Sequence, residues 1–256
     1  MSNVIYKSII DNMLWSYSRI KTYEDCPYRF FLKYIHEEEG QPMFYASYGS
    51  FVHKILQEFY EGELKQTELM SRFLSGFSKE VQGERPKESI VKSYIDKGTR
   101  YFSNFKPLPF EPVAIEQHAE FKVLGYNFRG YIDYIGERDG RLYIIDHKSR
   151  ELKPRSKRKK PTKKDSELDE MLVQLYLYSI YVKQVFGSWP KSLCFNCFKN
   201  GEFIEEPFRK QDLEMAVEWA SQTIETIRED ESFYPMEDFF SCKYICDLGH
   251  ACEMVN

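Results

Sequence analysis

Four cysteines, one near the start of the chain and three near its end, constrain the fold more than any other feature of the sequence. Cys26 stands apart, whereas Cys242, Cys246 and Cys252 follow one another closely. Four thiolates suit either Zn²⁺ or an iron–sulfur cluster, and their spacing does not choose between the two. Unligated, buried thiols are the alternative. If one metal centre holds all four, the two ends of the chain must meet in space.

The other two cysteines, Cys194 and Cys197, form a Cys-x-x-Cys pattern within a run of strand-like residues. Side chains three positions apart on a strand point to opposite faces of the sheet, so these thiols cannot chelate one ion there. We therefore expect both to be structural.

The length of the chain fits one domain, because 256 residues are enough to bury a large core. We divide it into a mainly helical part (1–112), a core of strands with one helix (113–208) and a C-terminal helix with the cysteine group (209–256). There is no apolar run long enough for a membrane span, and the first residues do not resemble a signal peptide. We therefore expect a reducing cytoplasm, where six cysteines favour metal binding or catalysis over disulfides.

Hydrophobic periodicity predicts a mixed α/β core. A helix begins at Ser16 or Ser18 and breaks near Pro27, a second begins at about Gly49, and residues 67–105 are mostly helical. From residue 113 the pattern of apolar residues becomes that of strands, which predicts strands over 113–124, 128–135 and 141–148 and a hairpin of 191–198 and 202–208. Helices are predicted over 170–186 and 211–228.

Acidic and basic side chains interrupt the central strands. Asp146 and Lys148 share one face of their strand, on which the other residues are apolar, and Asp133 interrupts the strand before it. If these strands are antiparallel neighbours, the two carboxylates could bind one cation, and carboxylates suit Mg²⁺ or Mn²⁺. Such a site could hydrolyse a phosphodiester, with the lysine orienting the attacking water. The alternative is a buried ion pair between Asp146 and Lys148.

These residues resemble the core of the PD-(D/E)XK nucleases. Gly130-x-x-Asp133 followed by Asp146-x-Lys148 carries the resemblance, with Asp146 where many relatives have Glu. Three further patterns in the same order are similar to the RecB-like branch, which includes AddB-type and CRISPR-associated exonuclease-like members. They are Gly49-x-x-x-His53, Gln174-x-x-x-Tyr178 and the Cys26-Pro27 helix. The resemblance implies a restriction-endonuclease-like mixed sheet flanked by helices, whose N- and C-terminal helical segments are joined by an iron–sulfur cluster.

The same resemblance implies roles for individual residues. His53, Asp133 and Asp146 would bind Mg²⁺ or Mn²⁺, and Lys148 would be the catalytic lysine. Gln174 and Tyr178 would support the site or contact DNA. The N-terminal cysteine and the three C-terminal ones would hold a [4Fe-4S] cluster, with Zn²⁺ as the alternative. An upstream acid often assists in this family, and we favour Glu116 over Glu120, although both lie on one strand face.

A basic segment runs from Lys153 to Lys164, in a chain whose net charge is -4. It is either a solvated loop or a loop that binds nucleic-acid phosphates, because clustered cations gain affinity by releasing counterions. Its candidate DNA-binding residues are Lys153, Arg155, Lys157, Arg158, Lys159, Lys160, Lys163 and Lys164.

The function that we predict is metal-dependent hydrolysis of DNA, by an exonuclease that prefers single strands or DNA ends. There is no Gly-x-x-x-x-Gly-Lys-Ser/Thr loop in the sequence, so any helicase, or any repair or adaptation protein, would be a separate partner. Two alternatives stay open: a nucleic-acid-binding module that does not cut, and an interaction protein with a structural zinc site. The pathway could be DNA repair, phage replication or CRISPR adaptation.

Overall fold

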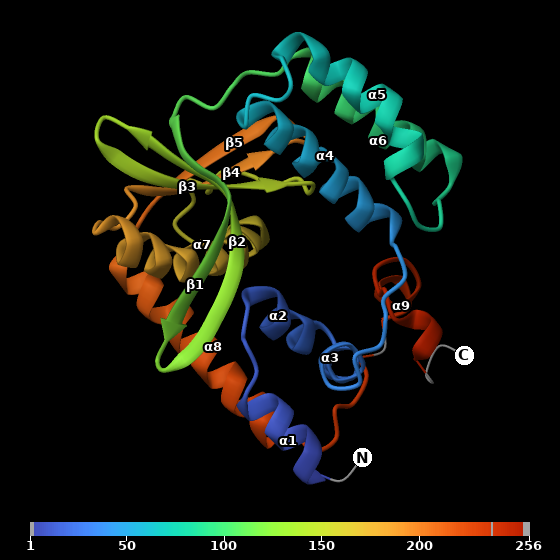
Figure 1. Cartoon of the computed structure of the whole chain (residues 1–256), viewed down its shortest axis with the longest axis vertical. Helices are drawn as coiled ribbons and strands as arrows, with labels where there is room; N and C mark the ends of the chain where they lie inside the picture. Colours follow the sequence, from blue (N-terminus) through green and yellow to red (C-terminus); the bar gives the residue numbers. More distant parts are fainter. Residues whose placement is uncertain (1–2, 237, 253–256) are drawn as a thin grey trace.

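A five-stranded mixed sheet forms the centre of the protein, in a computed structural model that describes residues 3–236 and 238–252 (Figure 1). The strands lie in the order β1-β2-β3-β4-β5, and every neighbouring pair is antiparallel except β3 and β4. Their bounds are β1 Glu111–Val123, β2 Tyr126–Arg138, β3 Arg141–Lys148, β4 Ser192–Cys197 and β5 Glu202–Pro207. This is the mixed α/β architecture expected from the sequence, and it is consistent with a restriction-endonuclease-like fold.

Helices pack against both faces of the sheet. One face carries the largest hydrophobic core, which joins side chains of all five strands to helices α1 (Asn3–Asp11), α2 (Tyr17–Asp25), α3 (Pro27–Tyr34), α7 (Lys163–Phe186) and α8 (Lys210–Glu229). On the other side, α4 (Phe44–Tyr60), α5 (Leu69–Glu80) and α6 (Glu88–Ser103) form a second core. The C-terminal segment adds α9 (Phe239–Tyr244), and two short 3₁₀ helices occupy Gln66–Glu68 and Gly249–Ala251. Among the described residues, no helix combines the length and the apolar character needed to cross a membrane.

Local sequence signals explain several of these boundaries. Ser16 caps α2 by accepting a hydrogen bond from the Arg19 amide at 3.2 Å, as expected of a serine at a helix start. At Asp139 and Gly140, φ angles of 54° and 68° form the tight turn between β2 and β3. The expected helix over 170–186 begins earlier, at Lys163, because Thr162 and Asp165 form a capping box before it. The last basic residues of the segment therefore lie on a helix.

The sheet opens between β2 and β3. Their pairing ends at Tyr134 opposite Ile145, whereas β2 continues to pair with β1 as far as Tyr126 opposite Val123. Beyond the opening, Trp15 takes the place of β3 and forms a parallel bridge with Phe128. Asp133, which precedes Tyr134, and Asp146, which comes after Ile145, therefore lie at this opening.

The two ends of the chain meet, as the cysteines predicted. In Figure 1 the C-terminal segment, drawn in red, lies beside α3 in blue. Asp247 joins them, because its carboxylate lies 2.7 Å from the Arg29 guanidinium and 2.5 Å from the Lys33 ammonium. The Gln41 amide also donates to the Asp247 carbonyl at 2.7 Å. Polar contacts therefore hold the C-terminal segment against α3, whether or not a metal centre is bound.

Candidate active site

The two strand acids lie at the opening of the sheet in different environments. Asp133 Oδ2 accepts a hydrogen bond from the His147 amide at 2.7 Å, so the carboxylate replaces the carbonyl that a continued ladder would supply. Asp146 is 5% exposed, and its Oδ2 forms an ion pair with the Lys148 ammonium at 2.8 Å. A buried carboxylate is costly unless it is paired, and Lys148 provides that pairing here.

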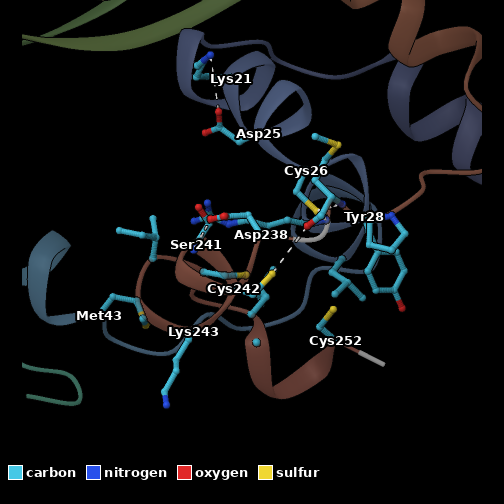
Figure 2. Close-up of a pocket in the computed structure, with 18 of the residues that line it drawn as sticks. Lys21, Asp25, Cys26, Tyr28, Met43, Asp238, Ser241, Cys242, Lys243 and Cys252 are labelled. Carbon is cyan, nitrogen blue, oxygen red and sulfur yellow. Dashed lines mark hydrogen bonds and ion pairs between the residues drawn. The ribbon is translucent and has the colours of Figure 1, made fainter. Parts of the chain in front are cut away.

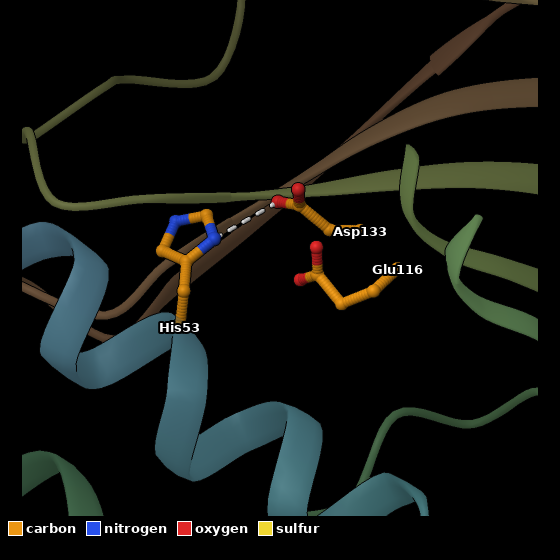
Figure 3. A group of neighbouring side chains, drawn as sticks. All are labelled: His53, Glu116 and Asp133. Carbon is orange, nitrogen blue, oxygen red and sulfur yellow. Dashed lines mark ion pairs between the residues drawn. The ribbon is translucent and has the colours of Figure 1, made fainter. Parts of the chain in front are cut away.

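Three side chains from different elements form a group that could bind a metal ion (Figure 3). His53 comes from α4, Glu116 from β1 and Asp133 from β2, and one ligand atom of each lies within 4.8 Å of the other two. His53 Nδ1 is 3.5 Å from Asp133 Oδ2. Glu116 has a φ of 46°, which places an unusual kink in β1 opposite Asp133. Neutral imidazole and carboxylates are the donors that Mg²⁺ or Mn²⁺ would find here.

Electrostatics favour a cation at this position. Burial and the charge of Asp146 raise the pKa of Asp133 well above its usual range, although the His147 amide opposes this. Burial also raises the pKa of Glu116, with smaller contributions from Glu61 and Asp146. Carboxylates that repel one another in a buried site are stabilised by a divalent cation. Burial lowers the pKa of His53, which keeps the ring neutral, as a metal ligand must be.

A chain of hydrogen bonds positions Lys148. Its ammonium donates to Gln174 Oε1 at 3.0 Å, and the Gln174 amide donates to the Tyr178 hydroxyl at 3.1 Å. Gln174 and Tyr178 face the same way because they lie one turn apart on α7. The Tyr178 ring in turn packs on Gly130 of β2, where any side chain would collide with it. Four of the residues singled out in the sequence therefore form one connected unit.

Two other residues that the sequence analysis considered, Glu120 and His147, lie outside the metal-binding group. Glu120 is exposed and lies 3.9 Å from His118, so the structure brings Glu116 and not Glu120 to the metal-binding group. His147 points away from Lys148, as expected, and its Nδ1 is 2.9 Å from the Asn196 amide nitrogen. Burial lowers the pKa of His147 well below its usual range, which fits a neutral core residue.

Comparison with known proteins decides the family. The model of the PD-(D/E)XK nuclease superfamily matches residues 14–253. The chain belongs to this superfamily. A solved structure of a candidate exonuclease from Eubacterium rectale is similar in fold, with a TM-score of 0.51 at 14% identity, covering 100% of this chain and 92% of that one.

A second structure, that of SSO0001, is 17% identical and covers 93% of this chain and 95% of its own, but its TM-score is 0.32. No curated protein matches the chain. PD-(D/E)XK nucleases use divalent metal ions, so the group around Asp133 is the candidate metal site of this one.

The four cysteines of this nuclease line one open cleft of about 1440 Å³, and none forms a disulfide (Figure 2). Cys26 lies between α2 and α3, where its sulfur accepts hydrogen bonds from the Arg29 and Met236 amides, both at 3.4 Å. Burial raises the pKa of the Cys246 thiol, and the nearby Cys26 adds to this effect. The chain thus brings together the residues that the sequence grouped as metal ligands.

The described cysteine sulfur atoms do not form a preassembled zinc site. In a tetrahedral site with Zn–S bonds of about 2.3 Å, neighbouring sulfur atoms are about 3.8 Å apart. Among the described residues, no three cysteine sulfur atoms lie within 4.8 Å of one another. The remaining pair, Cys194 and Cys197, belongs to two different hydrophobic cores, so their side chains lie on opposite faces as expected.

The basic segment lies against the edge strand β5. Arg155 is 3.0 Å from Glu206 of β5 and 2.6 Å from Asp169 of α7, so its guanidinium anchors the segment. Asp165 accepts hydrogen bonds from Ser156 and Thr162 and closes the segment into a loop. The other seven basic residues are exposed, although Lys164 forms an ion pair with Glu167. Strand β1, which carries Glu116 of the metal-binding group, is the opposite edge of the sheet.

Two openings give access to the site. A cavity of about 410 Å³ is lined by His53 and Glu116 together with Gly49, and it would admit a ligand to the metal-binding group. Lys148 and Arg150 instead line the larger cleft that continues to the cysteines. The metal-binding group and Lys148 therefore line different openings.

Proposed function

We propose that this PD-(D/E)XK nuclease is a Mg²⁺- or Mn²⁺-dependent deoxyribonuclease of the RecB-like branch that degrades single-stranded DNA or DNA ends. One observation carries the proposal: the metal-binding group and the Asp146–Lys148 pair lie together where β2 and β3 separate. Three oxygen or nitrogen donors, a buried carboxylate and a positioned lysine are the parts that phosphodiester hydrolysis needs.

The protein groups have separate roles in this proposal. His53, Glu116 and Asp133 would hold the cation, and Asp146, which pairs with Lys148, would be a further carboxylate ligand. When bound, the cation polarises the phosphodiester and the attacking water. Lys148 presents its ammonium to the phosphate oxygens or the water, and Gln174 fixes that ammonium in place.

We propose further that the four cysteines hold a [4Fe-4S] cluster, which joins α2 and α3 to the C-terminal segment. The four cysteines line one cleft, which supports a shared centre with thiolate ligands such as an iron–sulfur cluster. The exposed lysines of the loop closed by Asp165 contribute to DNA binding.

The test is cleavage of end-labelled single- and double-stranded DNA with Mg²⁺ or Mn²⁺, by wild type and by Lys148→Ala. We expect Lys148→Ala to lower the rate by about 10²- to 10⁴-fold, as loss of a group that assists proton transfer does, while the fold is retained. Lys7→Ala is the matched control, because the Lys7 side chain is 48% exposed and pairs with the exposed Glu231. Equal cleavage by wild type and Lys148→Ala would refute the assigned site. Wild-type binding of DNA without cleavage would favour the non-cutting module.

A further inference from the structure

The β1–β2 hairpin carries an exposed pair of rings beside the metal-binding group. His118 of β1 lies directly opposite Tyr131 of β2, and their ring centroids are 5.1 Å apart. Tyr131 is 60% exposed, and the His118 side chain is 46% exposed. Their strand neighbours Ala119 and Ile132 point the other way and are buried in the large core. The two rings therefore contribute little to the packing of the protein.

The position of the pair relative to the site follows from the register. Tyr131 precedes Asp133 by two residues, and His118 follows Glu116 by two. A strand rises about 3.4 Å per residue, so the ring pair lies about 7 Å along the hairpin from the metal-binding group. Neighbouring nucleotides of a strand whose phosphate reached the metal would pass over these rings.

The next pair along the hairpin supplies a positive charge. Arg129, opposite Glu120, is exposed and forms no ion pair with any residue between 3 and 236 or between 238 and 252. Glu120 lies 3.9 Å from His118 instead. An exposed ring followed by a cation is the arrangement that binds unpaired strands, because the ring stacks on a base and the cation attracts the phosphate.

We propose that Tyr131, supported by His118, is a stacking platform for an unpaired nucleobase next to the phosphate that is cut. The ligand class is a single-stranded nucleic acid of any sequence, since every base has a flat face. This inference rests on the proposed function and deepens it. A base in a duplex is already covered on both faces, so the platform favours single strands and frayed ends.

The test measures binding of fluorescent single-stranded DNA in the absence of divalent metal, using anisotropy. Tyr131→Ala should weaken binding by about 5- to 150-fold, the usual range for loss of one base–aromatic stack. Tyr131→Phe should bind like wild type because it keeps the ring. Leu124→Ala is the matched control, since Leu124 is a 68% exposed apolar residue on the same hairpin, where removal should leave affinity unchanged.

A second set of strands, each with one abasic site moved along the sequence, separates stacking from a structural effect. At one position the abasic strand should bind wild type and Tyr131→Ala equally, because the base that stacks is missing. A penalty for Tyr131→Ala that is the same at every abasic position, or wild-type affinity of Tyr131→Ala, would overturn the platform. Failure of wild type to cut DNA would refute the proposed function alone, because the binding experiment needs no cleavage.

Discussion

Gly130 supports the catalytic lysine although it lies on a different element. A Cβ at this position would lie 2.5 Å from Tyr178 Cε1 and 2.7 Å from its hydroxyl oxygen. Ordinary contacts between carbon atoms need about 3.5–4.0 Å, so in Gly130→Ala the ring must move by roughly 1 Å. Tyr178 is buried on α7 and cannot swing into solvent. The displacement would break its hydrogen bond from Gln174, the residue that accepts from Lys148.

The cost can be worked out from these contacts. Overpacking a core costs about 1–3 kcal/mol, and the lost hydrogen bond adds about 0.5–1.5 kcal/mol. Replacing a glycine within a strand returns about 0.5–1 kcal/mol. We expect Gly130→Ala to lower the free energy of unfolding by about 0.5–4 kcal/mol. Its cleavage rate should fall by about 10²-fold, because misplacing a catalytic group by roughly 1 Å has that effect.

Urea unfolding and single-turnover cleavage of labelled DNA measure the two effects. Gly49→Ala is the matched control for stability, because the nearest atom to its Cβ, Ser149 Oγ, is 3.4 Å away. In a Tyr178→Ala background, Gly130→Ala should cost nothing, since the ring that it would meet is absent. An undiminished cost in that background, or a single variant as stable and as active as wild type, would refute the reasoning.

Two further predictions concern the closure between the chain ends. Cys26→Ser should lose iron and melt at a lower temperature, because a metal ligand is lost. The serine side chain would still cap α3, as Cys26 does. Unchanged iron content and an unchanged melting temperature would contradict this prediction. Burial raises the pKa of Asp247, but the hydrogen bond from Lys33 and the charge of Arg29 outweigh it and keep that pKa below its usual 3.8. The contribution of Asp247 to stability is therefore present above about pH 4 and is lost as the pH falls through its folded pKa. Asp247→Asn should melt at a lower temperature than wild type at neutral pH and differ less in acid, and an equal difference at both would refute this pairing.

Sequence patterns predicted the core strands better than the start of the long helix. Strand β3 has the predicted bounds, because alternation and the Asp139-Gly140 turn fix both its period and its beginning. The start of α7 was placed seven residues too late, at 170 instead of 163. The basic run before it reads as a loop, and the capping box of Thr162 and Asp165 was the signal that could have corrected it. Helix α4 likewise begins at Phe44, before the expected Gly49, and α1 was not predicted.

The sequence named His53, Glu116 and Asp133 as candidates, and the structure brings these three together, whereas Asp146 pairs with Lys148. Strand spacing could not separate Glu116 from Glu120, because both lie on one face; the kink at Glu116 and the position of His53 decide between them. The opening of the sheet at Asp133 also left no signal in the sequence. There Trp15, which is distant from β3 in the sequence, takes the place of β3 beside β2. Such long-range pairings are fixed by tertiary packing and not by local pattern.

The segment at Trp15 covers a stretch of β2 that β3 leaves unpaired. Its amide donates to the Asn127 carbonyl and its carbonyl accepts from the Arg129 amide, both at 2.8 Å, on the side of β2 that β3 has left. Without this segment, β2 would present unpaired backbone groups flanked by the apolar side chain of Phe128, which is a template for pairing with another chain. The opening that makes room for the acids therefore creates an exposed edge. The residues just before α2 cover that edge, so its backbone groups are not open to pairing with a strand of another molecule.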